Sequence, residues 1–199
     1  MAALTPTNAL VMRVCLHTGL RLGDVLALRT EDLRPPRPGH RAGAARAAQP
    51  QGTAARAAPE ANNKATAQTP KVGQPRLQFW IREQKTGKRR RVNLTKELAA
   101  EMLRNAGEIW IFEGKNDASK HRTRQAVWAD VKRAAKAFRL PQNVAPHSVR
   151  KVYAVELLHK YHDLQRVQRA LNHSNPSVTM VYAMADKLYA AKYPNARRS

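Results

Sequence analysis

The segment from Pro35 to Pro75 most constrains how this 199-residue chain can fold. It holds seven of the chain's 12 prolines and only Val72 among large apolar residues. A stretch of this composition cannot bury enough apolar surface to offset the loss of chain entropy on folding, so we expect residues 35–75 to be a disordered, low-complexity insertion. The core must then come from residues 1–34 and 76–199, which together have the size of one domain.

The segment before the insertion has the pattern of two helices. Thr5 and Pro6 are a typical N-cap and first helical residue, and apolar residues recur at helical spacing as far as Cys15. Gly19 is expected to end this first helix, and "LGDVLAL" to form the second. Cys15 is the only cysteine, which excludes an intrachain disulfide, and its apolar position predicts a core residue.

After the insertion, one β-hairpin and then only helices are expected. Residues 77–81 and 90–94 are rich in strand-forming residues and flank the turn sequence Lys-Thr-Gly-Lys. From Thr95 onward apolar residues follow the helical period, in the stretches 95–106, 118–138 (where Val127, Val131, Ala134 and Phe138 share a face), 145–161, 163–171 and 175–193. The predicted fold class is α+β, mostly α, with one small sheet.

The charge of the chain points to a polyanionic partner. Lys and Arg number 36 against 14 Asp and Glu, a formal net charge of +22. Nucleic acid is the first candidate, because each cation placed near a phosphate releases a condensed counterion. An anionic membrane surface is the alternative, but no apolar run approaches the roughly 20 residues of a spanning helix and no signal peptide is evident. We therefore expect a cytoplasmic protein.

Two arginines are candidates for anion binding. His147 and Arg150 lie three residues apart just after a helix-starting proline, so both side chains face one way near a helix N-terminus. Arg21 lies in a short turn between two apolar helices, where its guanidinium could clamp a phosphate. The alternatives are a surface pair for His147 and Arg150, and for Arg21 an ion pair with Asp24 that fixes the arginine without any function.

A lysine of the hairpin turn and a histidine–tyrosine pair complete the candidates. Lys85 could reach a DNA groove or donate a proton, or be a solvated turn residue among basic neighbours. Asn172 follows a helix where a left-handed residue is common, so His173 is expected in a tight corner. Tyr182 lies nine residues later on the next helix, where an apolar stripe makes a core role the alternative.

In their order along the chain, the motifs "TGLRLGD", "QKTGK", "PHSVR" and "LNHSNPSVTMVYA" resemble those of the catalytic domain of the tyrosine recombinases, the phage integrase family. The resemblance covers essentially all of residues 1–34 and 76–199. It assigns to the family's catalytic set the residues Arg21, Lys85, His147, Arg150, His173 and Tyr182, with Asp24 as the supporting acid.

This resemblance implies transesterification of duplex DNA without a metal or other cofactor. Tyr182 would attack the scissile phosphate and form a 3′-phosphotyrosyl linkage, while Arg21 and Arg150 neutralise the phosphate oxygens. Lys85 would protonate the leaving 5′-oxygen, His147 would assist deprotonation of the tyrosine, and His173 would hydrogen-bond the phosphate. Further DNA contacts are expected from the basic residues after the turn, Lys88, Arg89, Arg90 and Arg91.

The chain departs from the family pattern in a few places. Asn172 replaces the glycine before the histidine, and Lys151 stands where histidine is frequent. No N-terminal core-binding domain is expected ahead of the catalytic domain. The implied assembly is a synaptic tetramer on DNA, in a prokaryotic cell at its nucleoid, with the C-terminal helix packing on a neighbour. The alternative is a catalytically inactive or truncated remnant, or an unrelated basic nucleic-acid-binding protein; the presence of all six residue types favours the enzyme.

Overall fold

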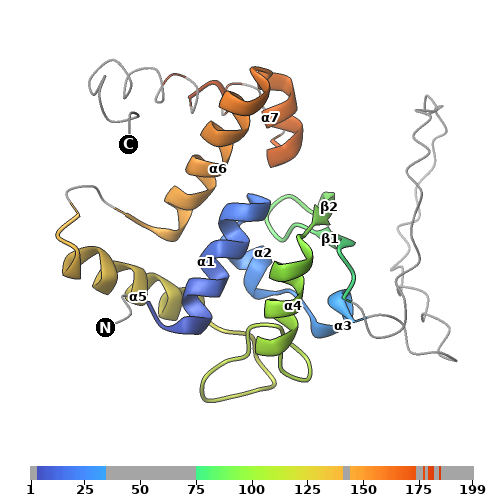
Figure 1. The fold of residues 1–199 in the computed structure, drawn as a ribbon, viewed down its shortest axis with the longest axis vertical. Coiled ribbons are helices and arrows are strands. Elements are labelled where there is room, and N and C mark those ends of the chain that lie inside the picture. The colour runs from blue at the N-terminus through green and yellow to red at the C-terminus, as the bar shows by residue number, and fades with distance from the viewer. Residues whose placement is uncertain are drawn as a thin grey trace, which may run out of the picture.

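The computed structural model describes residues 4–34, 75–140, 144–173, 177, 179–181 and 184. Apart from Pro75, the expected insertion lies outside these residues. The helices are α1 (Pro6–Thr18), α2 (Leu22–Leu26), α3 (Thr30–Leu33), α4 (Lys96–Asn105), α5 (Arg124–Ala137), α6 (Pro146–Tyr161) and α7 (Leu164–Leu171), and the strands are β1 (Gln78–Arg82) and β2 (Arg89–Asn93) (Figure 1). The predicted fold class, mostly helical with one small sheet, is confirmed.

Helix α1 is central to the packing. Pro6 occupies its first turn, and Gly19 ends it in the left-handed conformation, with φ of 63°, as predicted. Cys15 and the apolar residues on the same face are buried, and the helix contacts α2, α4 and α6. Figure 1 shows α6 and α7 above the end of α1, with the hairpin beside it. The residues that follow α1 therefore lie where several elements meet.

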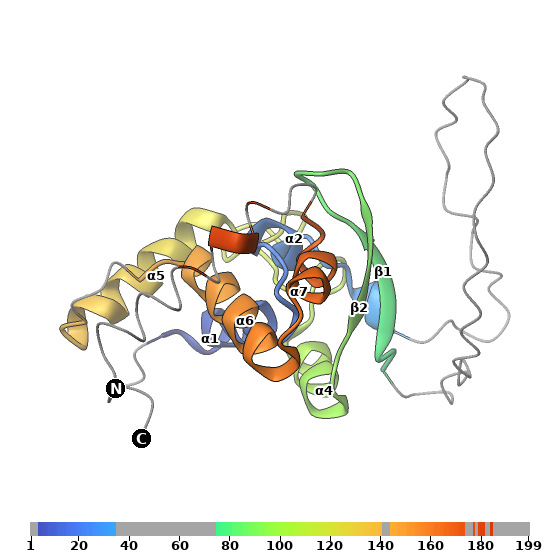
Figure 2. The same cartoon turned by 90° about the horizontal axis from the view of Figure 1, so that it is seen from above.

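The hairpin is antiparallel, with Phe79 opposite Val92 and Ile81 opposite Arg90. Phe79 and Val92 are buried in the main core, whereas Trp80 and its partner Arg91 are exposed on the other face. Because side chains alternate between the faces of a strand, Arg90 is directed to the inner face with Ile81 and Val92. Figure 2 shows the hairpin along one side of the helices, with its turn extending past α2 and α7.

Helices α6 and α7 form a second, smaller core of Ala154, Val167 and Leu171. Asp163 caps α7, accepting hydrogen bonds from the backbone N–H groups of Gln165 and Arg166, and Asn172 ends it with φ of 56°. Both features agree with the sequence prediction. They fix the direction in which the chain leaves α7 towards His173.

Helix α5 is shorter than predicted. It begins at Arg124 and not near residue 118, because the hydroxyl of Thr123 accepts the hydrogen bond of the Ala126 N–H and so caps the helix there. Phe138, predicted on the buried face, is 66% exposed because it follows the last helical residue. Of the predicted last helix, residues 177, 179–181 and 184 are described, and they are helical. Within the described ranges, no helix is long and apolar enough to cross a membrane.

Candidate active site

Arg21 is held by the hairpin. It is the N-cap residue of α2, two residues after Gly19, and its Nη1 donates to Oε2 of Glu83 at 2.6 Å. The alternative ion pair with Asp24 is wrong: the Asp24 carboxylate is buried against the hairpin backbone, where Oδ1 accepts the N–H of Gln84 at 2.8 Å. Arg21 and Asp24 thus each bind one of the two residues that directly follow β1, Arg21 the carboxylate of Glu83 and Asp24 the backbone N–H of Gln84.

Asp24 is in a poorly solvated position. Its Oδ2 is buried and has no hydrogen-bond partner. Burial raises the pKa of its carboxyl group above the ordinary value, and the nearby Glu83 charge adds to this, while the Gln84 N–H and the Arg21 charge oppose it. The Asp24 carboxylate therefore links α2 to the hairpin, although burial and the charge of Glu83 disfavour its ionised form.

Arg150 joins three segments. It lies in the first turns of α6 and is 2% exposed. Its guanidinium donates to the carbonyl oxygen of Gly19 and, at 2.6 Å, to that of Leu171. The arginine thus connects the turn that carries Arg21 to the end of α7, and its orientation is fixed by backbone carbonyls.

His173 lies beside Arg150. Its Nε2 is 3.4 Å from Arg150 Nη2, its Nδ1 is 3.0 Å from the hydroxyl of Thr179, and its backbone N–H donates to the carbonyl of Gln168. Burial and the charges of Arg150 and Arg21 lower the pKa of His173 to about 4. The ring is therefore neutral at neutral pH. Its Nε2 can then accept from Arg150 while Nδ1–H donates to Thr179.

His147 shares the same electrostatic surroundings from the exposed side. It lies one turn ahead of Arg150 on α6 and is exposed. Its pKa is lowered most by partial desolvation. The positive charges of Lys151, Arg150, Arg21 and Lys85 lower it further. Charges from α2 and the hairpin turn therefore act on a residue of α6, as expected for groups gathered around one site.

Lys85 is exposed on the turn between the strands. The turn is fixed by hydrogen bonds between Glu83 N and Lys88 O and between Gly87 N and Glu83 O, and Gly87 has φ of 66°. The Thr86 hydroxyl donates to Oε2 of Glu83 at 2.9 Å. The proposed nucleophile, Tyr182, lies outside the described residues.

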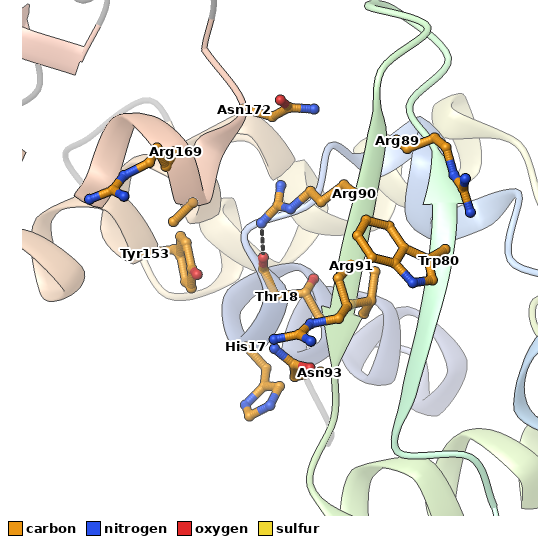
Figure 3. Close-up of a pocket in the computed structure, with 12 residues that line it drawn as sticks. His17, Thr18, Trp80, Arg89, Arg90, Arg91, Asn93, Tyr153, Arg169 and Asn172 are labelled. Atoms are coloured by element: carbon orange, nitrogen blue, oxygen red, sulfur yellow. Dashed lines mark hydrogen bonds between the residues drawn. The ribbon is translucent and has the colours of Figure 1, made fainter. Parts of the chain in front are cut away.

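The four basic residues after the turn do not behave alike. Lys88, Arg89 and Arg91 are exposed, and the Arg89 guanidinium lies 5.2 Å from the centre of the Trp80 ring. The Arg90 side chain is only 10% exposed. It donates to the carbonyls of Thr18 and Gly19 and lies 3.5 Å from Oε1 of Glu83, as the close-up in Figure 3 shows for Thr18.

A hollow of about 430 Å³ opens between the end of α1, β2, α6 and α7 (Figure 3). It is lined by His17, Thr18, Trp80, Arg89, Arg90, Arg91, Val92, Asn93, Tyr153, Arg169, Ala170 and Asn172. Its cationic lining suits an anion. In the part of the chain that the structure describes, no three His, Cys, Asp or Glu side chains are grouped as metal ligands.

Sequence reasoning missed two partners in this site. Glu83 is fully buried, yet it was not singled out, although it is the only acid between Arg76 and Lys96. A single carboxylate within a basic hairpin is a signal that could have identified it. Thr179, also buried, contacts His173 from the following helix and carries no comparable signal in the sequence.

Solved structures share this fold. The XerH site-specific recombinase bound to difH in a post-cleavage complex matches with a TM-score of 0.59 and 19% identity, over 98% of this chain and 48% of that one. A lambda integrase dimer bound to a COC′ core site matches with a TM-score of 0.55 and 15% identity, over 88% of this chain and 51% of that one. At these identities the similarity establishes the fold.

Curated relatives are similar in sequence over part of the chain. Tyrosine recombinase XerC of Herpetosiphon aurantiacus is 32% identical over 96 residues, which is 48% of this chain and 30% of that protein. Tyrosine recombinase XerD of Xanthomonas axonopodis pv. citri is 40% identical over 78 residues, 36% of this chain and 26% of that protein. The probable integrase/recombinase YoeC of Bacillus subtilis is 27% identical over 113 residues, 55% of this chain and 61% of that protein.

These alignments span less than a third of the XerC and XerD chains. The model of the phage integrase family matches residues 71–188, more than half of this chain and the region that contains the hairpin and helices α4 to α7. Together with the shared fold, this match shows that the chain belongs to the phage integrase family.

Proposed function

We propose that this chain is the catalytic unit of a tyrosine-type site-specific DNA recombinase or integrase. The observation that carries the proposal is the position of Arg150, which binds the carbonyls of Gly19 and Leu171 and lies beside His173. It joins the turn that carries Arg21, two residues after Gly19, to the end of α7. Residues 1–34 and 76–199 form this single unit, with residues 35–75 as an insertion. Family membership supplies the reaction class, and the curated XerC and XerD relatives are tyrosine recombinases.

The two arginines suit the stabilisation of a phosphate transition state. Negative charge grows on the non-bridging oxygens during attack, and fixed cations that face them lower the barrier without reorganising. Arg150 is held by two carbonyl groups and Arg21 by a carboxylate, so both guanidinium groups are oriented before DNA binds. Preorganised donors of this kind contribute most where water is excluded.

The remaining residues divide the proton transfers between them. A bond forms between the Tyr182 oxygen and phosphorus while the bond from phosphorus to the 5′-oxygen breaks. Tyrosine has an ordinary pKa near ~10, so His147 assists removal of its proton. Lys85 protonates the leaving 5′-oxygen, and neutral His173 hydrogen-bonds the phosphate through Nε2–H, in the tautomer whose Nδ1 accepts from the Thr179 hydroxyl. The reverse attack, by a partner strand's 5′-hydroxyl, reseals the DNA.

The substrate we propose is duplex DNA, bound by a homo-oligomer that becomes a synaptic tetramer. The net charge of +22 and the exposed Lys88, Arg89 and Arg91 beside the turn support a phosphate-rich partner. The XerH and lambda integrase structures are DNA complexes. The setting that fits is the cytoplasm of a prokaryote, where such an enzyme would act on chromosomal or mobile-element DNA at the nucleoid.

The test is capture of a covalent protein–DNA adduct on a denaturing gel. Nicked suicide duplexes drawn from the DNA that flanks the gene are incubated with the wild-type protein and with Tyr182→Phe. We expect an adduct with the wild type alone, because phenylalanine lacks the attacking oxygen, while both proteins bind DNA with similar salt dependence. Adducts from Tyr182→Phe would show that another residue is the nucleophile. Salt-sensitive binding without any adduct would favour the inactive, basic DNA-binding remnant.

A further inference from the structure

We infer that Glu83 is a positioning residue that holds the Arg21 guanidinium in place and joins it to the hairpin turn that carries Lys85. The inference rests on the proposed function, since it concerns two groups assigned to the same phosphate. Neither the sequence motifs nor the comparisons assign Glu83 a role.

The contacts of Glu83 are those of a junction. It is fully buried, and its Oε2 accepts from Arg21 Nη1 at 2.6 Å and from the Thr86 hydroxyl at 2.9 Å. Oε1 lies 3.5 Å from Arg90 Nη1. Its backbone N–H and carbonyl close the turn through Lys88 and Gly87. Glu83 lies two positions before Lys85. Its backbone closes the turn that carries Lys85, and its side chain orients Arg21.

In the described part of the chain, Glu83 is the one carboxylate that forms an ion pair with Arg21. Asp24, the acid that accompanies Arg21 in the motif, directs Oδ1 to the Gln84 N–H and keeps Oδ2 buried without a partner. The Arg21 side chain is 22% exposed, so it could rotate towards solvent if the ion pair were removed. Glu83 therefore supplies the restraint that the motif's own acid does not.

Charge balance points the same way. Arg21 and Arg90 both approach Glu83, and each would repel the other more strongly without the carboxylate between them. Burial alone would raise the pKa of Glu83, but hydrogen bonds from Thr86 and Arg21 and the charges of Arg21 and Arg90 outweigh it and lower the pKa. The group is therefore ionised at neutral pH.

The informative variant is Glu83→Gln, which keeps the size of the side chain and removes its charge. Because a small displacement of a clamping group is felt in the transition state, we expect the single-turnover cleavage rate to fall by about 10- to 100-fold. DNA affinity should change by less than about threefold, because Glu83 is buried and contacts no phosphate. Glu101→Gln is the matched control: it removes a carboxylate that pairs with Arg13 between α1 and α4.

A second substrate separates positioning of Arg21 from general support of the fold. Methylphosphonate at the scissile position replaces one charged oxygen by a methyl group, so the reaction depends less on a cation at the non-bridging oxygens. Each protein is assayed on the phosphate and the methylphosphonate duplex, and the ratio of the two rates is compared. Because both rates come from the same preparation, this ratio does not depend on the fraction of folded protein.

The duplex is the one on which the wild type forms its adduct. We expect the phosphate-to-methylphosphonate rate ratio to be about tenfold lower in Glu83→Gln than in the wild type and unchanged in Glu101→Gln, as a tenfold loss of one charge-dependent contact requires. An unchanged ratio in Glu83→Gln, whatever its overall rate, would overturn the inference and leave the proposed function standing. Absence of an adduct from the wild type would overturn both.

Discussion

The side chains of the candidate site are oriented by partners from other segments of the chain. Arg150 is held by carbonyl groups of Gly19 and Leu171, Arg21 by Glu83, and His173 by Thr179. A guanidinium bound to two carbonyls has lost most of its rotational freedom before a ligand arrives. The entropic cost of orienting these groups therefore arises on folding and not on DNA binding.

At the same scale, His173 predicts a pH dependence of stability. Its pKa falls to about 4 in the folded protein, against 6.5 ordinarily, so the unfolded chain binds the proton more readily. The stabilising effect of the neutral ring is complete above pH 6.5 and is lost as the pH falls towards 4. After allowance for solvent screening, we expect the wild type to lose about 1 kcal/mol more than His173→Gln between pH 6.5 and 5.

Urea unfolding of the two proteins at these pH values is the measurement. His147, whose pKa is also lowered, is retained in both proteins, so its contribution cancels in the comparison. Equal losses in the wild type and His173→Gln would mean that the ring titrates normally.

At the scale of elements, local signals predicted the structure well. Thr5-Pro6, Gly19, Asp163 and Asn172 begin or end helices as expected, because caps and left-handed residues act within a few positions of the chain. The hairpin formed around the Lys-Thr-Gly turn for the same reason.

The sequence was less informative where a residue's partner lies far along the chain. Arg90 was grouped with its exposed neighbours, but the strand register turns it inward to carbonyls some 70 positions earlier. The pairing of Arg21 with Glu83, and not with Asp24, depends equally on how the hairpin packs against α2. Spacing along one helix cannot reveal such tertiary choices.

Two glycines give a matched prediction at this scale. Gly19 and Gly87 have similar φ values, 63° and 66°. A Cβ at Gly19 would lie 2.2 Å from Tyr153 Cδ1, whereas nothing lies within 4 Å of one at Gly87. We expect Gly87→Ala to lower the free energy of unfolding by about 1–2 kcal/mol through backbone strain alone. Gly19→Ala should lower the free energy of unfolding by more than this, because the Tyr153 ring must also move.

Chemical denaturation of both variants measures the difference. The clash with Tyr153 is tested by introducing Gly19→Ala into a Tyr153→Ala protein. There Gly19→Ala should lower the free energy of unfolding by no more than Gly87→Ala does in the wild type, because the strain of the backbone remains but the clash is gone. Equal losses for the two single glycine variants would contradict the close contact between α6 and the end of α1.

At the scale of the whole molecule, the positive charge serves two purposes. Arg90 and Arg150 lie inside, where they bind backbone carbonyls and join the end of α1 to the hairpin and to α7. Arg89 and Arg91 lie on the exposed face of the same hairpin, beside Trp80. The net charge of +22 therefore overstates the number of lysine and arginine side chains that can contact a polyanion. In the hairpin, the alternation of side chains along the strand indicates which arginines are exposed to it.

The salt dependence of DNA binding tests this division. Each cation that contacts a phosphate contributes about 0.9 to the slope of log K against log salt concentration, so Arg89→Ala and Arg91→Ala should each reduce the slope by up to that amount. Arg90→Ala should leave the slope nearly unchanged. It should instead lower the free energy of unfolding by about 1–3 kcal/mol, because the buried carbonyl of Thr18 loses the Arg90 donor and that of Gly19 is left with Arg150. Fluorescence anisotropy titrations between 50 and 200 mM salt, with urea unfolding of the same variants, measure both quantities. If Arg90→Ala reduced the slope as much as Arg91→Ala while unfolding like the wild type, then Arg90 would turn outward to DNA, and the junction of α1, the hairpin and α6 would have to be held by Glu83 and Arg150 alone.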